Sequence, residues 1–151
     1  MNPLSSEEYK DIYSKVPRLC VDLIIKTHKG IVLTRRSLPE WNNTWHLPGG
    51  AVRYGETIEQ AAARTAEREL HLAVTVLRPL GYIEFPSEER ERGFGWAISI
   101  PLLCTPHSEE FTAGEGSSEA RAFTELPDDM ILEQKTFLST HWADIMANSA
   151  A

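Results

Sequence analysis

Apolar residues recur every four positions within the stretch 58–70, and charged or polar residues fill the positions between them. This spacing is typical of a helix that buries one stripe of side chains. Thr57 precedes the stripe and Gln60 follows three residues later, which is the capping-box pattern of a helix start. The stripe is formed by Ile58, Ala62, Ala66 and Leu70.

A different pattern precedes this helix. The β-rich run 19–26 (LCVDLIIK) and the run 31–37 (IVLTRRS) are separated by the turn THKG, so they predict a β-hairpin. Pro101 lies inside a later run, where it favours an edge strand or a bulge. The charged segment 88–93 (EERERG) is expected to be a solvated turn, with a lid over a substrate as the alternative. Further strands are expected within 45–50, 74–85, 96–105 and 121–126.

Two more helices are expected near the ends of the chain. The segment SSEEYKDIYSKV has Ser5 or Ser6 as its cap, and Pro17 ends it. The segment DDMILEQKTFLSTHWADIMAN predicts a closing helix capped by Asp128 or Asp129. The order helix, strands, helix, strands, helix predicts an α/β fold with a mixed sheet between helices.

Length and charge narrow the class of protein. The 151 residues are expected to form a single domain over 1–151, and the net charge is 15 − 22 = −7. An acidic chain without a basic stripe argues against a nucleic-acid partner. A small phosphorylated ligand remains compatible, since a few arginines in one cleft suffice. The candidates are Arg35, Arg36, Arg53 and Arg64.

The cysteines and the N-terminus bear on location. Cys20 and Cys104 both lie in apolar runs, so we expect small buried thiols rather than a disulfide framework. The first residues are polar and acidic, unlike a signal peptide. No apolar run approaches the roughly 20 residues that cross a bilayer. We therefore expect a cytoplasmic domain with no membrane partner.

Five residues stand at fixed distances around the capped helix: Gly50, Glu56, Arg64, Glu69 and Leu72. They are in register with the Nudix hydrolase signature, G-x5-E-x7-R-E-U-x-E-E-x-G-U, where U is aliphatic. The PGG turn and the hairpin before it also resemble that family. The resemblance implies an α/β/α sandwich with a mixed sheet, and a hydrolase that acts on a nucleoside diphosphate derivative.

Three signature positions differ in this chain. Thr65 and Arg68 stand in place of two glutamates, and His71 stands in place of a glycine. Positions 65, 68 and 69 share one helix face, where three carboxylates would hold several hard cations on a diphosphate. Glu69 alone supplies one ligand from the helix. A single Mg²⁺, with Mn²⁺ as a substitute, is therefore expected rather than a cluster.

One branch of the family, the GDP-mannose mannosyl hydrolases, resembles this chain over most of its first 85 residues and lacks the same two glutamates. That branch binds one Mg²⁺ and cleaves the sugar C–O bond of GDP-mannose with inversion. The likeness implies that Asp22, Arg36 and Arg64 surround the diphosphate and leaving group. It implies that the Gly49 carbonyl and Glu69 hold the metal, and that the chain forms a homodimer.

Two departures from that branch concern catalysis. Where the branch has an arginine directly after the PGG turn, this chain has Ala51, and Arg53 follows two places later. Where the branch has a glutamine and a histidine as metal ligand and base, this chain has Gly-Ser at 116–117. Glu115 and Glu119 flank that pair. Either glutamate is a candidate for the base, and Glu115 is a candidate metal ligand.

Simpler roles exist for several of these residues. Glu56 and Arg64 can pair to hold the loop against the helix, and Glu69 can be a solvated helix charge. Asp22 interrupts an apolar strand, where a buried carboxylate needs a partner or its pKa rises. His46 is expected to be a packing residue, with a cleft-facing role as the alternative.

Three functions follow from these readings. The first is an Mg²⁺-dependent hydrolase of a nucleoside diphosphate sugar, with GDP-mannose among its candidate substrates, in which water attacks the anomeric carbon. The second is a conventional Nudix pyrophosphohydrolase, in which water attacks phosphorus. The third is a non-catalytic nucleotide-sugar binding module, which the cationic Arg68 beside Glu69 favours.

Overall fold

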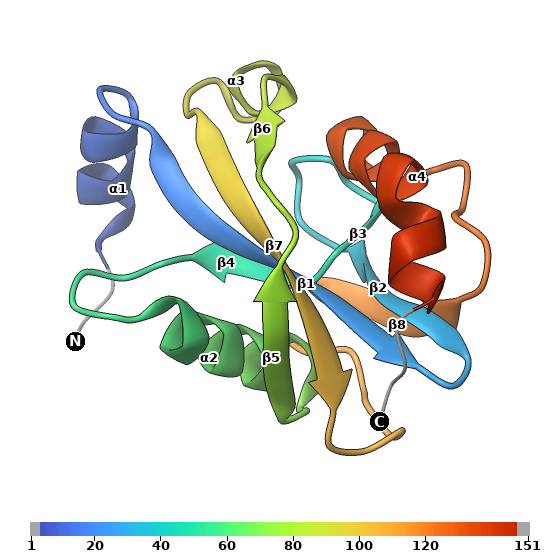
Figure 1. Cartoon of the computed structure of the whole chain (residues 1–151). Helices are drawn as coiled ribbons and strands as arrows, with labels where there is room; N and C mark the ends of the chain where they lie inside the picture. Colours follow the sequence, from blue (N-terminus) through green and yellow to red (C-terminus); the bar gives the residue numbers. More distant parts are fainter. Residues whose placement is uncertain (1–3, 148–151) are drawn as a thin grey trace.

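The computed structural model describes residues 4–147 (Figure 1); the ends of the predicted domain, with Asn148 of the closing helix, lie outside that range. The helices are α1 (Ser6–Tyr13), α2 (Ile58–Leu70), α3 (Ser87–Arg92) and α4 (Leu132–Ala147). The strands are β1 (Arg18–Thr27), β2 (Gly30–Arg36), β3 (Trp45–His46), β4 (Gly49–Ala51), β5 (Val74–Pro79), β6 (Ile83–Phe85), β7 (Ala97–Pro106) and β8 (Ser117–Phe123).

The sheet is mixed and follows the order β3-β2-β1-β7-β5. β1 and β7 run parallel, and the other pairings are antiparallel. On its other edge β1 pairs first with β4, through Asp22 opposite Gly49, and then with β2, through Lys26 opposite Ile31. Because these two partners diverge after Asp22, the sheet forks beside that carboxylate.

Helices cover both faces of the sheet (Figure 1). Val21, Leu23 and Ile25 of β1 pack with the apolar stripe of α2. The alternate residue Ile24 packs with Leu138 and other residues of α4. Successive strand residues point to opposite faces, so one strand supplies both cores. The predicted α/β/α sandwich with a mixed sheet is confirmed.

The helix that carries the signature begins and ends as its sequence dictates. The Thr57 side chain accepts from the Gln60 N–H, and the Gln60 side chain accepts from the Thr57 N–H. His71 ends the helix in the left-handed region, at φ 52°. That conformation favours glycine, the residue the signature expects at this position. The predicted helix and capping box are confirmed.

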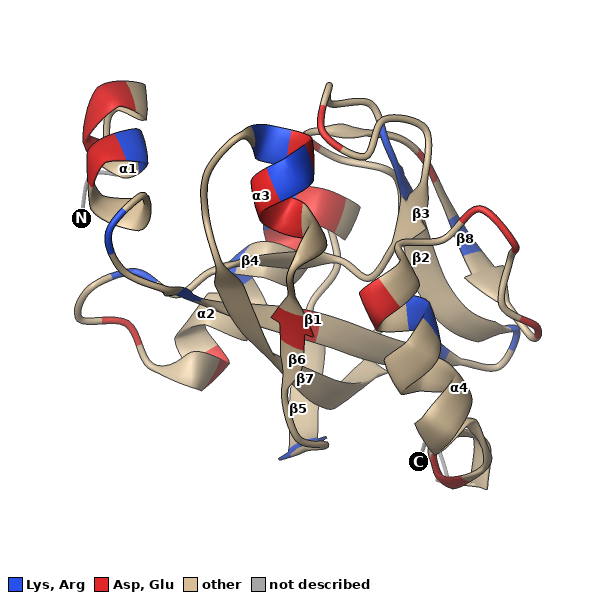
Figure 2. Ribbon diagram, turned by 90° about the horizontal axis from the view of Figure 1, so that it is seen from above, with Lys and Arg blue, Asp and Glu red and all other residues tan. Residues whose placement is uncertain are grey.

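Several local predictions are wrong. The segment 88–93 is not a solvated turn, because α3 covers most of it and Glu88 is fully buried; Figure 2 shows acidic and basic residues side by side along this helix. Pro101 lies in β7, between β1 and β5, so the edge alternative is wrong; the other alternative, a bulge, is nearer, because the ladder on the β5 and β6 side is interrupted between Leu102 and Ser99. α4 begins at Leu132, so neither Asp128 nor Asp129 caps it.

Two further findings concern the thiols and membranes. Cys20 and Cys104 are buried and free, as predicted. Within residues 4–147, none of the helices has the length and apolar character needed to cross a bilayer.

Candidate active site

A pocket of about 710 Å³ opens at the fork of the sheet and is lined by residues of all four helices. Its volume falls within the roughly 300–1,000 Å³ of small-molecule sites. Most of the predicted site residues meet here, from β1, β2, β4, α2 and the loop between β4 and α2. They are Asp22, Arg36, Gly49, Arg53, Arg64 and Glu69.

The charge of this pocket is opposite to that of the chain. Within the described range 4–147, six arginines line it, against three carboxylates. The whole sequence has a net charge of −7. Cations gathered in one concave site on an acidic protein point to a small anionic ligand. The arginines are Arg18, Arg36, Arg53, Arg64, Arg68 and Arg92, and the carboxylates are Asp22, Glu69 and Glu88.

Arg64 joins the loop before α2 to the helix itself. Its Nε and Nη2 donate to the two Glu56 carboxylate oxygens at 2.8 and 2.9 Å, and Nη2 also donates to the Ala51 carbonyl at 2.8 Å. The hydrogen bonds from Arg64 lower the pKa of Glu56 to about 2. The structural pairing of Glu56 and Arg64 is therefore present, and Arg64 also lines the pocket.

Glu69 lies at the inner end of the pocket, where α2 meets β4. One of its oxygens accepts from the Gly49 N–H at 3.3 Å. Arg68 Nη2 donates to the Gly49 carbonyl at 3.0 Å and lies 3.5 Å from the other Glu69 oxygen. Burial raises the pKa of Glu69 to about 7, although Arg68 and the Gly49 N–H oppose this. Glu69 is thus a buried site residue and not a solvated helix charge.

This arrangement bears on the metal that the family resemblance implies. The Gly49 carbonyl and Glu69, the two oxygen ligands expected from this region, are both engaged by the Arg68 guanidinium. An arginine at position 68 is expected either to point away from the metal position or to contact phosphate; the first alternative is wrong, because the side chain reaches the Gly49 carbonyl and Glu69. Among residues 4–147, no cluster of three or more His, Cys, Asp and Glu side chains could hold a metal ion. As arranged, these residues do not fit a divalent cation.

Asp22 enters the pocket from β1 and is held by a residue that sequence reasoning missed. Gln134 of α4 donates from Nε2 to Asp22 at 3.2 Å, and its Oε1 accepts from the Leu47 N–H at 2.9 Å. Burial raises the pKa of Asp22 to about 7, and the Gln134 hydrogen bond opposes the shift. Asp22 is therefore a buried carboxylate with a fixed orientation and an amide partner.

Arg36, the last residue of β2, and Trp41, in the loop that follows, form one wall of the pocket. Arg36 donates from Nε to the Glu40 carbonyl at 2.8 Å, and its guanidinium lies 5.4 Å from the centre of the Trp41 ring. Burial, followed by the nearby charge of Arg92, lowers the pKa of Arg36. A half-buried arginine beside a second cation is a favourable site for an anion.

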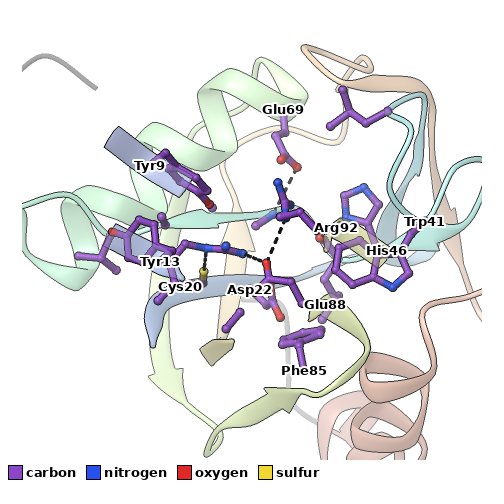
Figure 3. A pocket seen from close by; sticks show the side chains of 18 of the residues that line it. Tyr9, Tyr13, Cys20, Asp22, Trp41, His46, Glu69, Phe85, Glu88 and Arg92 are labelled. Carbon is purple, nitrogen blue, oxygen red and sulfur yellow. Dashed lines mark hydrogen bonds and ion pairs between the residues drawn. The ribbon is translucent and has the colours of Figure 1, made fainter. Parts of the chain in front are cut away.

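The far wall contains an ion-pair cluster that sequence reasoning also missed. Arg18 of β1 and Arg92 of α3 both pair with the same oxygen of Glu88. The Arg18 guanidinium lies 5.5 Å and 5.9 Å from the rings of Tyr9 and Tyr13. Figure 3 shows these aromatic side chains at one end of the pocket and Glu69 at another. The cluster fastens α1 and α3 to the sheet.

His46 is a buried packing residue, and its ring is neutral. Its Nδ1 lies 2.7 Å from the Leu47 carbonyl, so Nδ1 carries the proton, and Nε2 lies 3.1 Å from the Thr34 hydroxyl. Burial, followed by the charge of Arg36, lowers the pKa of His46 to about 3. Both ring nitrogens are engaged and the ring stays neutral. The packing role predicted for His46 agrees with this geometry.

The late loop does not join the pocket. Its backbone caps α2, because the Gly114 and Glu115 N–H groups donate to the Glu69 and Arg68 carbonyls at 2.8 and 3.3 Å. The Glu115 side chain is exposed and outside the pocket lining. Glu119 lies in β8 with an exposed side chain, 3.7 Å from Arg121. In this arrangement neither glutamate faces the positions expected for the substrate or the metal.

Two features define the class of protein. One is a mixed sheet between helices, and the other is the set of signature residues Gly50, Glu56, Arg64 and Glu69 at a cationic pocket. The chain belongs to the Nudix family, since the model of the NUDIX domain matches residues 16–139.

Two curated relatives share part of this domain. The ADP-ribose pyrophosphatase of Methanocaldococcus jannaschii is 33% identical over 107 residues, which cover 71% of this chain and 62% of the relative. The low-salt glycan biosynthesis protein Agl8 of Haloferax volcanii is 35% identical over 81 residues, which cover 54% of this chain and 52% of the relative. Both matches thus span less than two thirds of the relatives.

Solved structures share the fold. A MutT protein from Methanosarcina mazei Go1 superposes with a TM-score of 0.74 at 18% identity, over 86% of this chain and 96% of that one. A bifunctional NMN adenylyltransferase/ADP ribose pyrophosphatase from Francisella tularensis, complexed with AMP and a manganese ion, gives 0.72 at 19% identity, over 92% and 46%. These likenesses support the fold assignment.

Proposed function

We propose that this chain hydrolyses a nucleoside diphosphate sugar by attack of water at the anomeric carbon, with GDP-mannose as the first substrate to test. The observation that carries the proposal is the reversed charge of the pocket, six arginines to three carboxylates among residues 4–147. A diphosphate supplies the anion that such a site favours. Arginine is suited to it because its planar fork of donors matches phosphate oxygens.

The remaining pocket suits the rest of such a ligand. Tyr9, Tyr13, Trp41 and Phe85 line it. Aromatic rings provide stacking surfaces for a nucleobase and apolar faces for a sugar. The volume of about 710 Å³ accommodates a ligand of this size.

In the proposed reaction the C–O bond breaks rather than the P–O bond. Water attacks the anomeric carbon, the bond from that carbon to the phosphate oxygen breaks, and the nucleoside diphosphate leaves with the electron pair. Arg36, Arg64 and Arg68 stabilise the charge on the leaving diphosphate. Asp22 takes the proton from the attacking water, because it is the pocket carboxylate whose partner is an amide rather than a cation. No step is assigned to the Mg²⁺ or Mn²⁺ that the resemblance implies.

Specific observations bear on the proposal and on its two alternatives. The ADP-ribose pyrophosphatase relative favours a pyrophosphohydrolase, in which water attacks phosphorus. The glycan biosynthesis relative favours a nucleotide sugar. The contact of Arg68 with Glu69 favours a binding module without turnover.

The homodimer that the family resemblance implies is also a proposal. Light scattering of the protein as it elutes from a gel-filtration column tests it.

A substrate panel separates these functions. The full chain is incubated with GDP-mannose, other nucleotide sugars, ADP-ribose and dinucleotides, each with EDTA and with Mg²⁺, and products are identified by mass. A free sugar with an intact nucleoside diphosphate supports the proposal. A nucleoside monophosphate with a sugar phosphate means pyrophosphohydrolase activity. Ligand binding without any product means a binding module.

A further inference from the structure

The cation at the inner end of the pocket, beside Glu69, is a side chain of the protein, Arg68. Arg68 Nη2 lies 3.0 Å from the Gly49 carbonyl oxygen and 3.5 Å from Glu69 Oε1. A carbon atom added to Gly50 would lie 2.7 Å from the same nitrogen, so a side chain there would displace the guanidinium from its place over β4.

These contacts compete with a divalent ion. A hard cation in this region would bind the Gly49 carbonyl and the Glu69 carboxylate, and a guanidinium already satisfies both oxygens. The guanidinium carries a positive charge, so it repels a second cation. Positions 65, 68 and 69 share this helix face. Position 65 adds no negative charge, because it is Thr65, whose hydroxyl is buried and unpartnered.

Arg68 also retains capacity to bind a ligand. Among residues 4–147, its side-chain hydrogen bonds all come from Nη2, which leaves the donors on Nε and Nη1. About a third of its side chain, 32%, is exposed, and the residue lines the pocket. A guanidinium with outward donors binds phosphate oxygens directly.

We propose that Arg68 is the resident cation of this site, that it takes the place of the divalent metal, and that it binds the diphosphate itself. The diphosphate part of this inference rests on the proposed function. Metal binding by the free protein does not rest on it, so the two parts can be tested separately.

The first test measures Mn²⁺ binding to the full chain without substrate, by calorimetry and by the electron paramagnetic resonance signal of free Mn²⁺. Wild type should show no saturable site, whereas Arg68→Ala should bind one ion with an affinity at least about tenfold above the weakest binding that the measurement detects. Arg68→Met removes the charge but keeps the aliphatic stem, and it should behave alike if Arg68→Ala unfolds. Arg78→Ala, a surface arginine paired with Asp144, is the matched control and should match wild type. A tight Mn²⁺ site in wild type, equal to that of both Arg68 variants, would overturn the proposal.

The second test measures pyrophosphate binding in EDTA. Wild type should bind it, and Arg68→Ala should bind it about 10- to 100-fold more weakly until Mn²⁺ is added. Pyrophosphate binding by wild type that requires Mn²⁺ would also overturn the proposal. If pyrophosphate fails to bind any variant while Mn²⁺ still discriminates between them, the diphosphate function is wrong and the resident cation stands.

Discussion

Arg64 holds Glu56 through two hydrogen bonds of 2.8 and 2.9 Å, which fix the loop after the PGG turn to the helix behind the pocket. The pair lowers the pKa of Glu56 to about 2 from its usual 4.5. A carboxyl whose folded pKa is depressed contributes stability above its unfolded pKa, and that contribution is lost as pH falls through the folded pKa.

Glu56→Gln should therefore lower the free energy of unfolding by about 1–3 kcal/mol at pH 7. The difference from wild type should shrink as pH falls from about 4.5 towards 2. Urea unfolding at several pH values measures this. Glu59→Gln, an exposed carboxylate in the first turn of the same helix, should have little effect. Equal losses for the two variants would mean that the pair does not stabilise the loop.

Asp22 is expected to be the base. Because only the ionised carboxylate accepts a proton, kcat should rise with pH through about 7, the raised pKa of Asp22. Asp22→Asn should lower kcat by about 10²–10⁴-fold and remove this limb of the profile. Gln134→Leu keeps the carboxylate but loses its orienting amide, so kcat should fall while the limb remains. If the pH profile of kcat is unchanged in Asp22→Asn and kcat falls strongly in Glu115→Gln or Glu119→Gln, the base is a glutamate of the late loop and not Asp22.

Arg36 is expected to bind the diphosphate. Its cationic neighbour Arg92 makes an anion favourable at this wall of the pocket. Arg36→Gln should weaken ADP binding about 10- to 100-fold, the value of a lost charge-assisted hydrogen bond. Calorimetry at low and high salt measures this. Arg78→Gln, outside the pocket, is the control, and a similar loss in both variants would assign the effect to general surface charge.

The elements that could be predicted from sequence are those set by neighbouring residues. The β1–β2 hairpin follows from two β-rich runs around a short turn, and α2 follows from its stripe and from the Thr57–Gln60 capping box. The spacing of the signature residues around α2 predicted that Gly49, Arg64 and Glu69 lie together, and all three line one pocket. Local patterns sufficed because each of these features depends on residues close in the chain.

The failures depend on partners far along the chain. Segment 88–93 looked like a solvated turn, but Glu88 is buried because Arg18, 70 residues earlier, pairs with it. Gln134 could not be assigned to the site, since its partner Asp22 lies 112 residues away. Arg68 was expected to point away from the metal or to contact phosphate; it does not point away, because the path of β4 brings the Gly49 carbonyl to it.

The measurement that tests the central claim most directly is hydrolysis of GDP-mannose, or of the nucleotide sugar that the panel selects, in ¹⁸O-labelled water. Attack at the anomeric carbon places the label in the free sugar and leaves the nucleoside diphosphate unlabelled, which is the result we expect. Label in a phosphate would mean attack at phosphorus and would contradict the account.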